Sequence, residues 1–263
     1  PKPLPPLPAW PLPKPKGTER YEVKYEAEDK VVLAWPTVAH SHPDADALTV
    51  LDMLMDNSAA GLLNLRLNQA QKVKAAGSYT SHQNDAGAWY LWALPKKGQT
   101  PQEAEQLLLE TVAALKNGEF EDSDIAAVIT AFEIDEKRKL ESNEGRAAAM
   151  ASSFVSFEPW EREVERLERL SRVTKDDVLR AAKLYLDGDR VSVTRRAGKP
   201  EISSIAKPAF TKVEIDPSRQ SPFLKEALAI PAEPIEPRWL AANRDYQVAP
   251  IAGGRLYAAK NPY

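Results

Sequence analysis

The histidines of this chain are its best candidates for metal or acid–base chemistry, and two of the three lie close together. His40 and His42 are two residues apart and Asp44 follows two residues later, whereas His82 is distant in the sequence. Imidazole and carboxylate groups are common Zn²⁺ ligands, so His40, His42 and Asp44 form one candidate metal site. The alternative, which we prefer, is a loop before a helix that carries these residues as solvated capping groups.

Ser41, between the two histidines, is the candidate nucleophile. An activated serine needs a base that reaches its hydroxyl, but adjacent residues seldom present both side chains to one substrate. The sequence contains no G-x-S-x-G elbow, and the absence of cysteine excludes a thiol nucleophile, thiolate metal ligands and disulfides. Gly253-Gly254 lacks the spacing of a phosphate-binding loop and is predicted to be a hairpin turn. We therefore predict no catalytic, cofactor-binding or metal-binding residues here.

Carboxylates are abundant in two segments, residues 133–144 and 161–168, where acid–base pairs could be sought. Both segments alternate their carboxylates with lysine and arginine. This mixture of signs is typical of a solvated helix face, which is our interpretation of both. Aromatic residues on the predicted strands and helices are assigned to the core: Trp35, Trp89, Tyr90, Trp92, Phe132 and Tyr185.

Composition indicates a globular chain with a substantial core. Of 263 residues, 43% are hydrophobic and 28% are charged, and the net charge is −3. No basic cluster with interleaved aromatics suggests a nucleic-acid partner. No apolar run approaches the roughly 20 residues of a membrane-spanning helix, and no signal segment opens the sequence. Because the first residue is Pro1, we expect a piece that was processed or excised from a longer protein.

The elements that would position these residues begin with two strands and a helix. Residues 21–25 alternate like a strand, and a second strand is predicted over residues 31–37, where residues 31–35 form a continuous apolar run. Pro43 is predicted at the first position of a helix that extends to Met55, and a short helix is predicted over residues 62–67.

A hairpin and several helices are predicted next. Val73, Ala75, Tyr79 and Ser81 would form one face of a strand that turns at residues 83–87 into a second strand over residues 89–94. The later elements are a capped helix from Thr100 to Asn117, a helix from Asp122 that Gly145 interrupts, helices over residues 161–170 and 174–186, and a strand over residues 190–196. This order predicts an α+β fold with helices packed on a mainly antiparallel sheet.

Proline marks the predicted domain boundaries. Residues 1–16 are predicted to be an extended proline-rich arm, although Pro3 to Pro8 would also suit an SH3 or WW domain. Residues 17–200 form the predicted domain, and residues 201–242 are a predicted proline-containing linker. Residues 243–263 are predicted to be the truncated start of another domain, with a hairpin around Gly253-Gly254.

Two segments carry a family resemblance. One is Leu33-Ala34-Trp35-Pro36-Thr37 followed by His42-Pro43-Asp44, and the other is Val173-Thr174-Lys175-Asp176-Asp177-Val178 followed by residues 181–186. In order and content, the chain from about Pro11 to Arg196 resembles the non-catalytic domain of the M16 (pitrilysin and insulinase) zinc metallopeptidases. One departure is Asp56 to Leu63, where relatives often have a glycine-rich turn and Ser-Arg-Leu, so the role of that turn is not carried over.

The resemblance implies a fold of the LuxS and mitochondrial processing peptidase type, and a parent of two similar halves that close around a peptide. Catalytic domains of this family hold zinc with H-x-x-E-H, a motif that this chain lacks. The chain would then be the second domain of the first half, the inter-half linker and the first strands of the second half. It would need no cofactor itself, would be inactive alone, and would depend on zinc in an upstream domain.

The implied role is architectural, with the chain forming part of the chamber wall and supporting the upstream catalytic domain. The substrate of the parent protein would be a peptide or a small unfolded protein. The alternative is a non-enzymatic scaffold or inactive partner subunit, because the fold also resembles inactive subunits of mitochondrial processing peptidase and respiratory core proteins. Relatives suggest a periplasmic or secreted parent, a point on which the residues themselves are silent.

Overall fold

A computed structural model describes residues 14–57, 60–201, 206–212, 214, 216, 219–231, 237 and 239–260. The chain divides into two compact units, residues 1–202 and residues 203–263. The proline-rich arm predicted for residues 1–16 lies outside the described residues, apart from its last three positions. None of the helices in the described part is long and apolar enough to cross a membrane.

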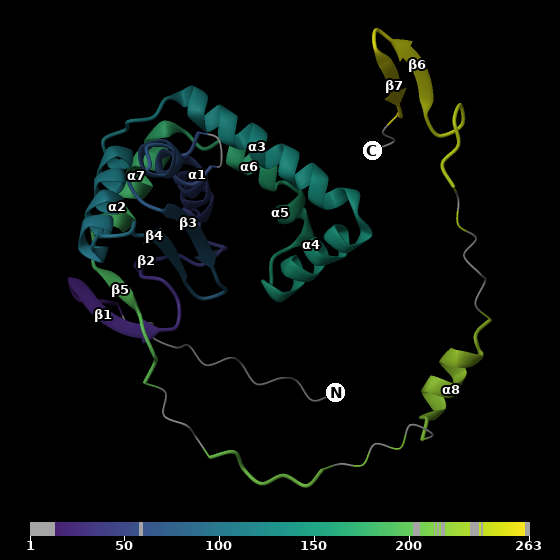
Figure 1. Cartoon of the computed structure of the whole chain (residues 1–263), viewed down its shortest axis with the longest axis horizontal. Coiled ribbons are helices and arrows are strands. Elements are labelled where there is room, and N and C mark those ends of the chain that lie inside the picture. The colour runs from purple at the N-terminus through teal and green to yellow at the C-terminus, as the bar shows by residue number, and fades with distance from the viewer. Residues whose placement is uncertain are drawn as a thin grey trace. The chain divides into compact units, whose positions relative to one another are not determined.

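A five-stranded sheet organises the first unit (Figure 1). Its strand order is β1-β5-β2-β4-β3, and only the neighbours β1 and β5 are parallel. This arrangement confirms the predicted α+β fold with a mainly antiparallel sheet. The strands are β1 (Thr18–Tyr25), β2 (Lys30–Thr37), β3 (Ala75–His82), β4 (Gly87–Leu94) and β5 (Arg190–Ala197).

Helices occupy the long connections between these strands. Helices α1, α2 and α7 contact the sheet, and α3 and α6 pack on α1. The helices are α1 (Ala45–Met55), the π-helix η1 (Asn64–Gln69), α2 (Pro101–Lys116), α3 (Asp122–Glu141), α4 (Asn143–Val155), α5 (Trp160–Val164), α6 (Arg166–Ser171) and α7 (Lys175–Leu186). A capping box at Thr100 starts α2, as the sequence predicts, and another at Thr174 starts α7, where the sequence predicts a helix start. In each box the threonine and the acidic residue three positions later satisfy each other's backbone amides.

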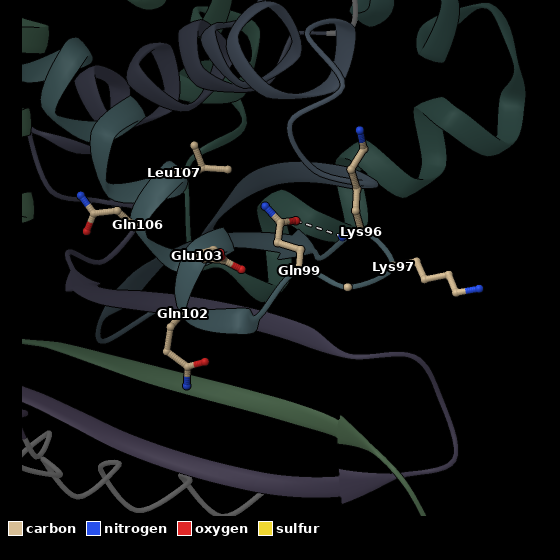
Figure 2. Close-up of a pocket in the computed structure, with 8 residues that line it drawn as sticks. Lys96, Lys97, Gln99, Gln102, Glu103, Gln106 and Leu107 are labelled. Atoms are coloured by element: carbon tan, nitrogen blue, oxygen red, sulfur yellow. Dashed lines mark hydrogen bonds between the residues drawn. The ribbon is translucent and has the colours of Figure 1, made fainter.

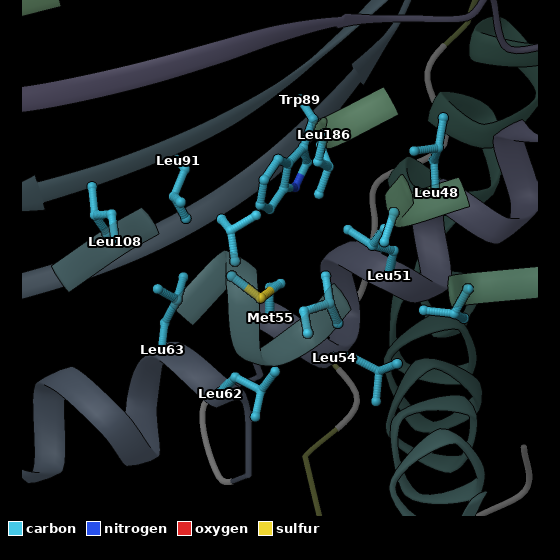
Figure 3. Close-up of a cluster of buried hydrophobic side chains, with 14 of the residues drawn as sticks. Leu48, Leu51, Leu54, Met55, Leu62, Leu63, Trp89, Leu91, Leu108 and Leu186 are labelled. Carbon is cyan, nitrogen blue, oxygen red and sulfur yellow. The ribbon is translucent and has the colours of Figure 1, made fainter. Parts of the chain in front are cut away.

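The hydrophobic core lies between one face of the sheet and the helices. Alternate residues of β4, Trp89 and Leu91, point toward α1, whose Leu48, Leu51 and Met55 are fully buried (Figure 3). Every second residue of the strand and every third or fourth residue of the helix thus face the same apolar layer. Burying each such side chain contributes about 1.5–3 kcal/mol, so this layer supplies much of the driving force for folding.

The structure corrects two predicted helix boundaries. Helix α1 begins at Ala45, so Pro43 lies in the preceding turn and Asp44 is the N-cap. The long charged helix ends at Glu141, and Ser142 caps the start of α4 by accepting a hydrogen bond from the Gly145 amide. Gly145 therefore lies in the first turn of α4, three residues after the interruption.

The predicted facing of strands β3 and β4 was partly wrong. The side of β3 that packs against the helices carries Ala76 and Ser78, whereas Tyr79 is half exposed on the other side. Tyr90 and Trp92, which we predicted in the core, lie on the same outer side because they alternate with the buried Trp89 and Leu91. Phe132 and Tyr185 are partly buried at the margin of the core.

The second unit contains a short helix and a hairpin. Helix α8 (Pro222–Ala229), capped by Ser221, lies in the segment predicted to be a linker, where no helix was expected. Strands β6 (Gln247–Ile251) and β7 (Gly254–Ala258) form an antiparallel hairpin, as the sequence predicts around Gly253-Gly254. Gly253 has a φ of 76°, a conformation that favours glycine, so the tight turn depends on that residue.

Candidate functional site on the open face of the sheet

The structure separates the two histidines that are neighbours in the sequence. His42 is exposed, and its Nδ1 accepts a hydrogen bond of 3.0 Å from the Asp44 amide. The Asp44 carboxylate turns toward α7, where Arg180 and Tyr185 each donate to it at 2.7 Å. His42 and Asp44 are therefore committed to the turn that begins α1 and to the contact between α1 and α7.

His40 instead lines a polar pocket of about 340 Å³ together with His82 of β3. His82 Nδ1 lies 3.0 Å from the Val38 carbonyl oxygen, and His40 Nδ1 lies 3.9 Å from the Glu158 carboxylate. The remaining nitrogen of the His82 ring and Nδ1 of His40 have no hydrogen-bond partner among the residues that the structure describes. Sequence reasoning missed this pair because the contact forms only when the β3–β4 hairpin folds back beside residues 38–40.

The charged groups around this pocket are already paired with one another. Arg169 donates to Asp46 at 3.0 Å, and Arg162 forms an ion pair with Glu158. Across the described ranges, no group of three or more histidine, aspartate or glutamate side chains is placed to hold a metal ion. The pocket thus has polar walls but no free charge cluster that would activate water or bind a cation.

Ser41 is exposed in the loop between these histidines. In the described part of the chain, no hydrogen bond joins its hydroxyl to either neighbouring imidazole. The carboxylates of the two charged segments mostly face solvent and pair along their own helices, as Lys137 does with Glu133. These groups lie as the sequence interpretation expected, on helix surfaces.

A second hollow, of about 750 Å³, lies beside the start of α2. Two of its polar side chains have local partners: Gln99 accepts from the Lys96 amide at 2.9 Å, and Glu103 accepts from the Thr100 amide at 2.7 Å. Figure 2 shows the side chains of Lys97 and Gln106 pointing away from each other. The hollow is therefore a feature of the turn and the helix cap, without convergent chemistry.

The side of the sheet away from the core, which we name the open face, carries large exposed apolar side chains. Four of its side chains are about half exposed: Tyr21 (55%), Val23 (49%), Tyr25 (54%) and Tyr79 (49%). The strand register places these in one layer with Val32, Ala34, Tyr90, Trp92, Leu94, Val191 and Val193. Contiguous apolar surface of this kind commonly marks an interaction site.

Aromatic contacts organise the half of the open face near β3. The rings of Tyr79 and Tyr90 stack with centroids 4.7 Å apart, and the Lys30 ammonium lies 4.4 Å above the Trp92 ring. Burial, and then the charge of Arg195, lowers the pKa of Lys30. The open face thus carries stacked aromatic rings with the Lys30 cation beside them.

Comparison with known families identifies the chain. Its residues 1–132, half of its length, match the model of the peptidase M16 inactive domain. The chain therefore belongs to the M16 zinc protease family as an inactive domain, in agreement with the resemblance of its sequence segments. A search among curated proteins gave no match.

Solved structures show the same fold at low identity. A protease from Helicobacter pylori matches with a TM-score of 0.67 and 19% identity over 73% of this chain and 47% of its own. The inactive peptidase domain of a candidate zinc protease from Bordetella parapertussis matches with a TM-score of 0.58 and 20% identity. The match covers 65% of this chain and 94% of the Bordetella domain. A chain of Complex III2 from Candida albicans matches with a TM-score of 0.57 and 13% identity. The match covers 69% of this chain and 46% of the Candida chain. The chain thus spans about half the length of the Helicobacter protease.

Proposed function

We propose that this inactive domain is a structural part of a zinc metallopeptidase and supports a catalytic domain that carries H-x-x-E-H elsewhere in the parent protein. In this role it forms part of the wall of a chamber that encloses a peptide or a small unfolded protein. The observation that carries the proposal is the open face, where Tyr21, Tyr25 and Tyr79 are half exposed although they belong to a well-formed sheet.

Packing against another domain would remove this apolar layer from water. Each square ångström of apolar surface buried contributes roughly 25 cal/mol, so covering several aromatic side chains favours association strongly. The stacked pair of Tyr79 and Tyr90 supplies a rigid platform that loses little side-chain entropy on binding. We therefore assign the open face as the surface that holds the neighbouring domain.

The experiment uses the segment encoded upstream of Pro1, produced separately. We expect that segment to contain H-x-x-E-H and to cleave peptide faster when the chain is added. Tyr79→Asp places a charge on the open face and should reduce this stimulation. Leu184→Asp is the matched control, because Leu184 is 60% exposed on α7, away from that face, and the substitution should leave the stimulation unchanged.

Other outcomes would contradict parts of this proposal. Peptide cleavage by the upstream segment that is indifferent to the added chain would remove the supporting role. Equal loss in the Tyr79→Asp and Leu184→Asp variants would remove the assignment of the open face.

A scaffold without catalysis is the second candidate, and the match to a chain of Complex III2 favours it, because that assembly uses the same fold. In this case the chain would be an inactive partner subunit and would still dock through the open face. An upstream segment without H-x-x-E-H would support the scaffold over the peptidase.

A further inference from the structure

The two edges of the sheet differ in how their backbone groups are satisfied. At the β3 edge, side chains from α1 and η1 bind the outward-facing backbone groups: Asn68 pairs with both the amide and the carbonyl of Ala76, and Asp56 accepts from the Ser78 amide at 2.9 Å. These contacts occupy the positions that an added strand would need, so the β3 edge is closed.

The β1 edge is open by comparison. Strand β1 pairs with β5 on one side, and no segment among the described residues pairs with its other side. The strand has eight residues and contains neither proline nor glycine, and all but one of its residues are exposed. An edge strand of this length that no described segment covers can pair with an added strand, provided that the charges of the added strand match its own.

The sequence of β1 is complementary to itself when it runs antiparallel about Val23. In that register Glu22 lies opposite Lys24 of a second copy, and Lys24 lies opposite Glu22 of that copy. On the other side of the strand, Tyr21 lies opposite Tyr25 of the second copy, and Val23 lies opposite Val23 of that copy. Opposite charges and aromatic pairs directly across two antiparallel strands stabilise the pairing.

Neighbouring registers lose this match. A two-fold axis at Glu22 would place Glu22 against Glu22 and Arg20 against Lys24, which are like-charge pairs. A shift by a single residue between the strands would instead move the tyrosines to the side that carries the charges. The charges therefore favour the register centred on Val23 over the one centred on Glu22.

Neither Glu22 nor Lys24 is held tightly within its own copy. Lys24 forms no ion pair with the rest of the described chain. Glu22 is bound only loosely, by Arg196 at 3.4 Å.

We propose that β1 is a self-association edge, through which two copies of this chain join in an antiparallel β1–β1 pair centred on Val23. The two sheets then form one continuous sheet with a two-fold axis, in which each copy offers the same strand to the other. Tyr21 and Tyr25 of the two copies stack in this interface and extend the open face across the axis. The interface does not depend on the proposed peptidase role.

Charge exchange tests the register in the full chain by sedimentation velocity. Lys24→Glu places two like pairs at the interface and should weaken the dimer about tenfold or more. The double variant Glu22→Lys with Lys24→Glu exchanges the charges, restores opposite pairs and should recover dimerisation. An exposed control on the far side of the sheet is Lys183→Glu of α7, which should dimerise like the parent chain.

Cysteine cross-linking tests the geometry directly, because the chain has no cysteine of its own. Val23→Cys should form a disulfide-linked dimer under mild oxidation, since the two positions face each other at the axis. Tyr21→Cys and Tyr25→Cys should not cross-link alone, but a mixture of the two should do so.

Three results would overturn the proposal. The first is a chain that stays monomeric at high protein concentration. The second is a failed charge exchange. In that case Lys24→Glu dimerises as well as the parent chain, or the double variant does not recover dimerisation although circular dichroism shows that it is folded. The third is equal cross-linking of Tyr21→Cys alone and Val23→Cys, which would indicate docking through another surface or another partner strand.

Discussion

The carboxylate of Asp44, at the start of α1, accepts a hydrogen bond of 2.7 Å from the hydroxyl of Tyr185, near the end of α7. The same carboxylate accepts from Arg180 one turn earlier on α7, also at 2.7 Å. Burial and the bond to Asp44 raise the pKa of Tyr185 to about 12, while the Arg180 bond lowers the pKa of Asp44. This network fixes α1 on α7, and through α1 it positions the core under the sheet.

Replacing Asp44 by asparagine should therefore destabilise the chain. The folded-state pKa of Asp44 is lowered, so its contribution is present above the unfolded value near 4 and is lost as pH falls through the folded value. Because Arg180 is half exposed, we expect a loss of only about 1–2 kcal/mol at neutral pH. Urea unfolding at a series of pH values should show that the free energy of unfolding falls less steeply at acid pH in Asp44→Asn than in the parent chain.

The exposed Asp85→Asn variant serves as the control for this measurement, and it should unfold like the parent chain at every pH. An equally steep fall of the free energy of unfolding at acid pH in Asp44→Asn and in the parent chain would contradict the assigned role of the network.

Asp52 should have the opposite dependence on pH. Its burial beneath β3 raises its pKa, so the folded state holds the proton more tightly than the unfolded chain. Stability should fall as pH rises from about 4 through the raised folded value. Asp52→Asn removes the titrating group, and its stability, measured by urea unfolding, should not show this fall.

Asp52→Ala tests the hydrogen bonds of the same residue. Its Oδ1 accepts from Ser78 Oγ at 2.6 Å and from Trp89 Nε1 at 2.7 Å. Removing the carboxylate leaves these buried donors without a partner, at a cost of about 2–4 kcal/mol. Fluorescence-monitored unfolding should report the loss, and a change below about 0.5 kcal/mol, which is ordinary for a surface substitution, would refute this account.

Gly145 is predicted to be indispensable at the junction of α3 and α4. A β-carbon at this position would overlap the carbonyl oxygen of Lys139. Gly145→Ala should therefore force the junction apart and destabilise the chain by about 1–3 kcal/mol in thermal or urea unfolding. Gly188→Ala is the matched control, because no atom lies within 4 Å of the added β-carbon, and it should be neutral or slightly stabilising.

Local signals in the sequence predicted much of this fold. The capping box at Thr100, the helix start at Thr174 and the turn between β3 and β4 depend on residues a few positions apart, and each prediction is confirmed. The parallel pairing of β1 with β5 joins distant ends of the domain, and no local pattern encodes it. The family resemblance, rather than periodicity, supplied the expectation of this domain type.

The candidate site was harder to predict because β4 is apolar on both of its sides. In the run from Trp89 to Leu94, alternation separates two faces but does not say which one the helices cover. Tyr90 and Trp92 were therefore assigned to the core, and the open face was not anticipated. The polar contact of His40 with the β3 region was missed for a related reason, since only the folded hairpin brings His82 near it.

Zinc content together with peptide cleavage tests the central claim, that this domain builds structure and holds no reaction centre. We predict that the purified full chain carries no stoichiometric zinc and cleaves no peptide, and that His40→Ala and His82→Ala change neither property. Tightly held zinc at one ion per chain, with peptide turnover abolished in those variants, would contradict the account.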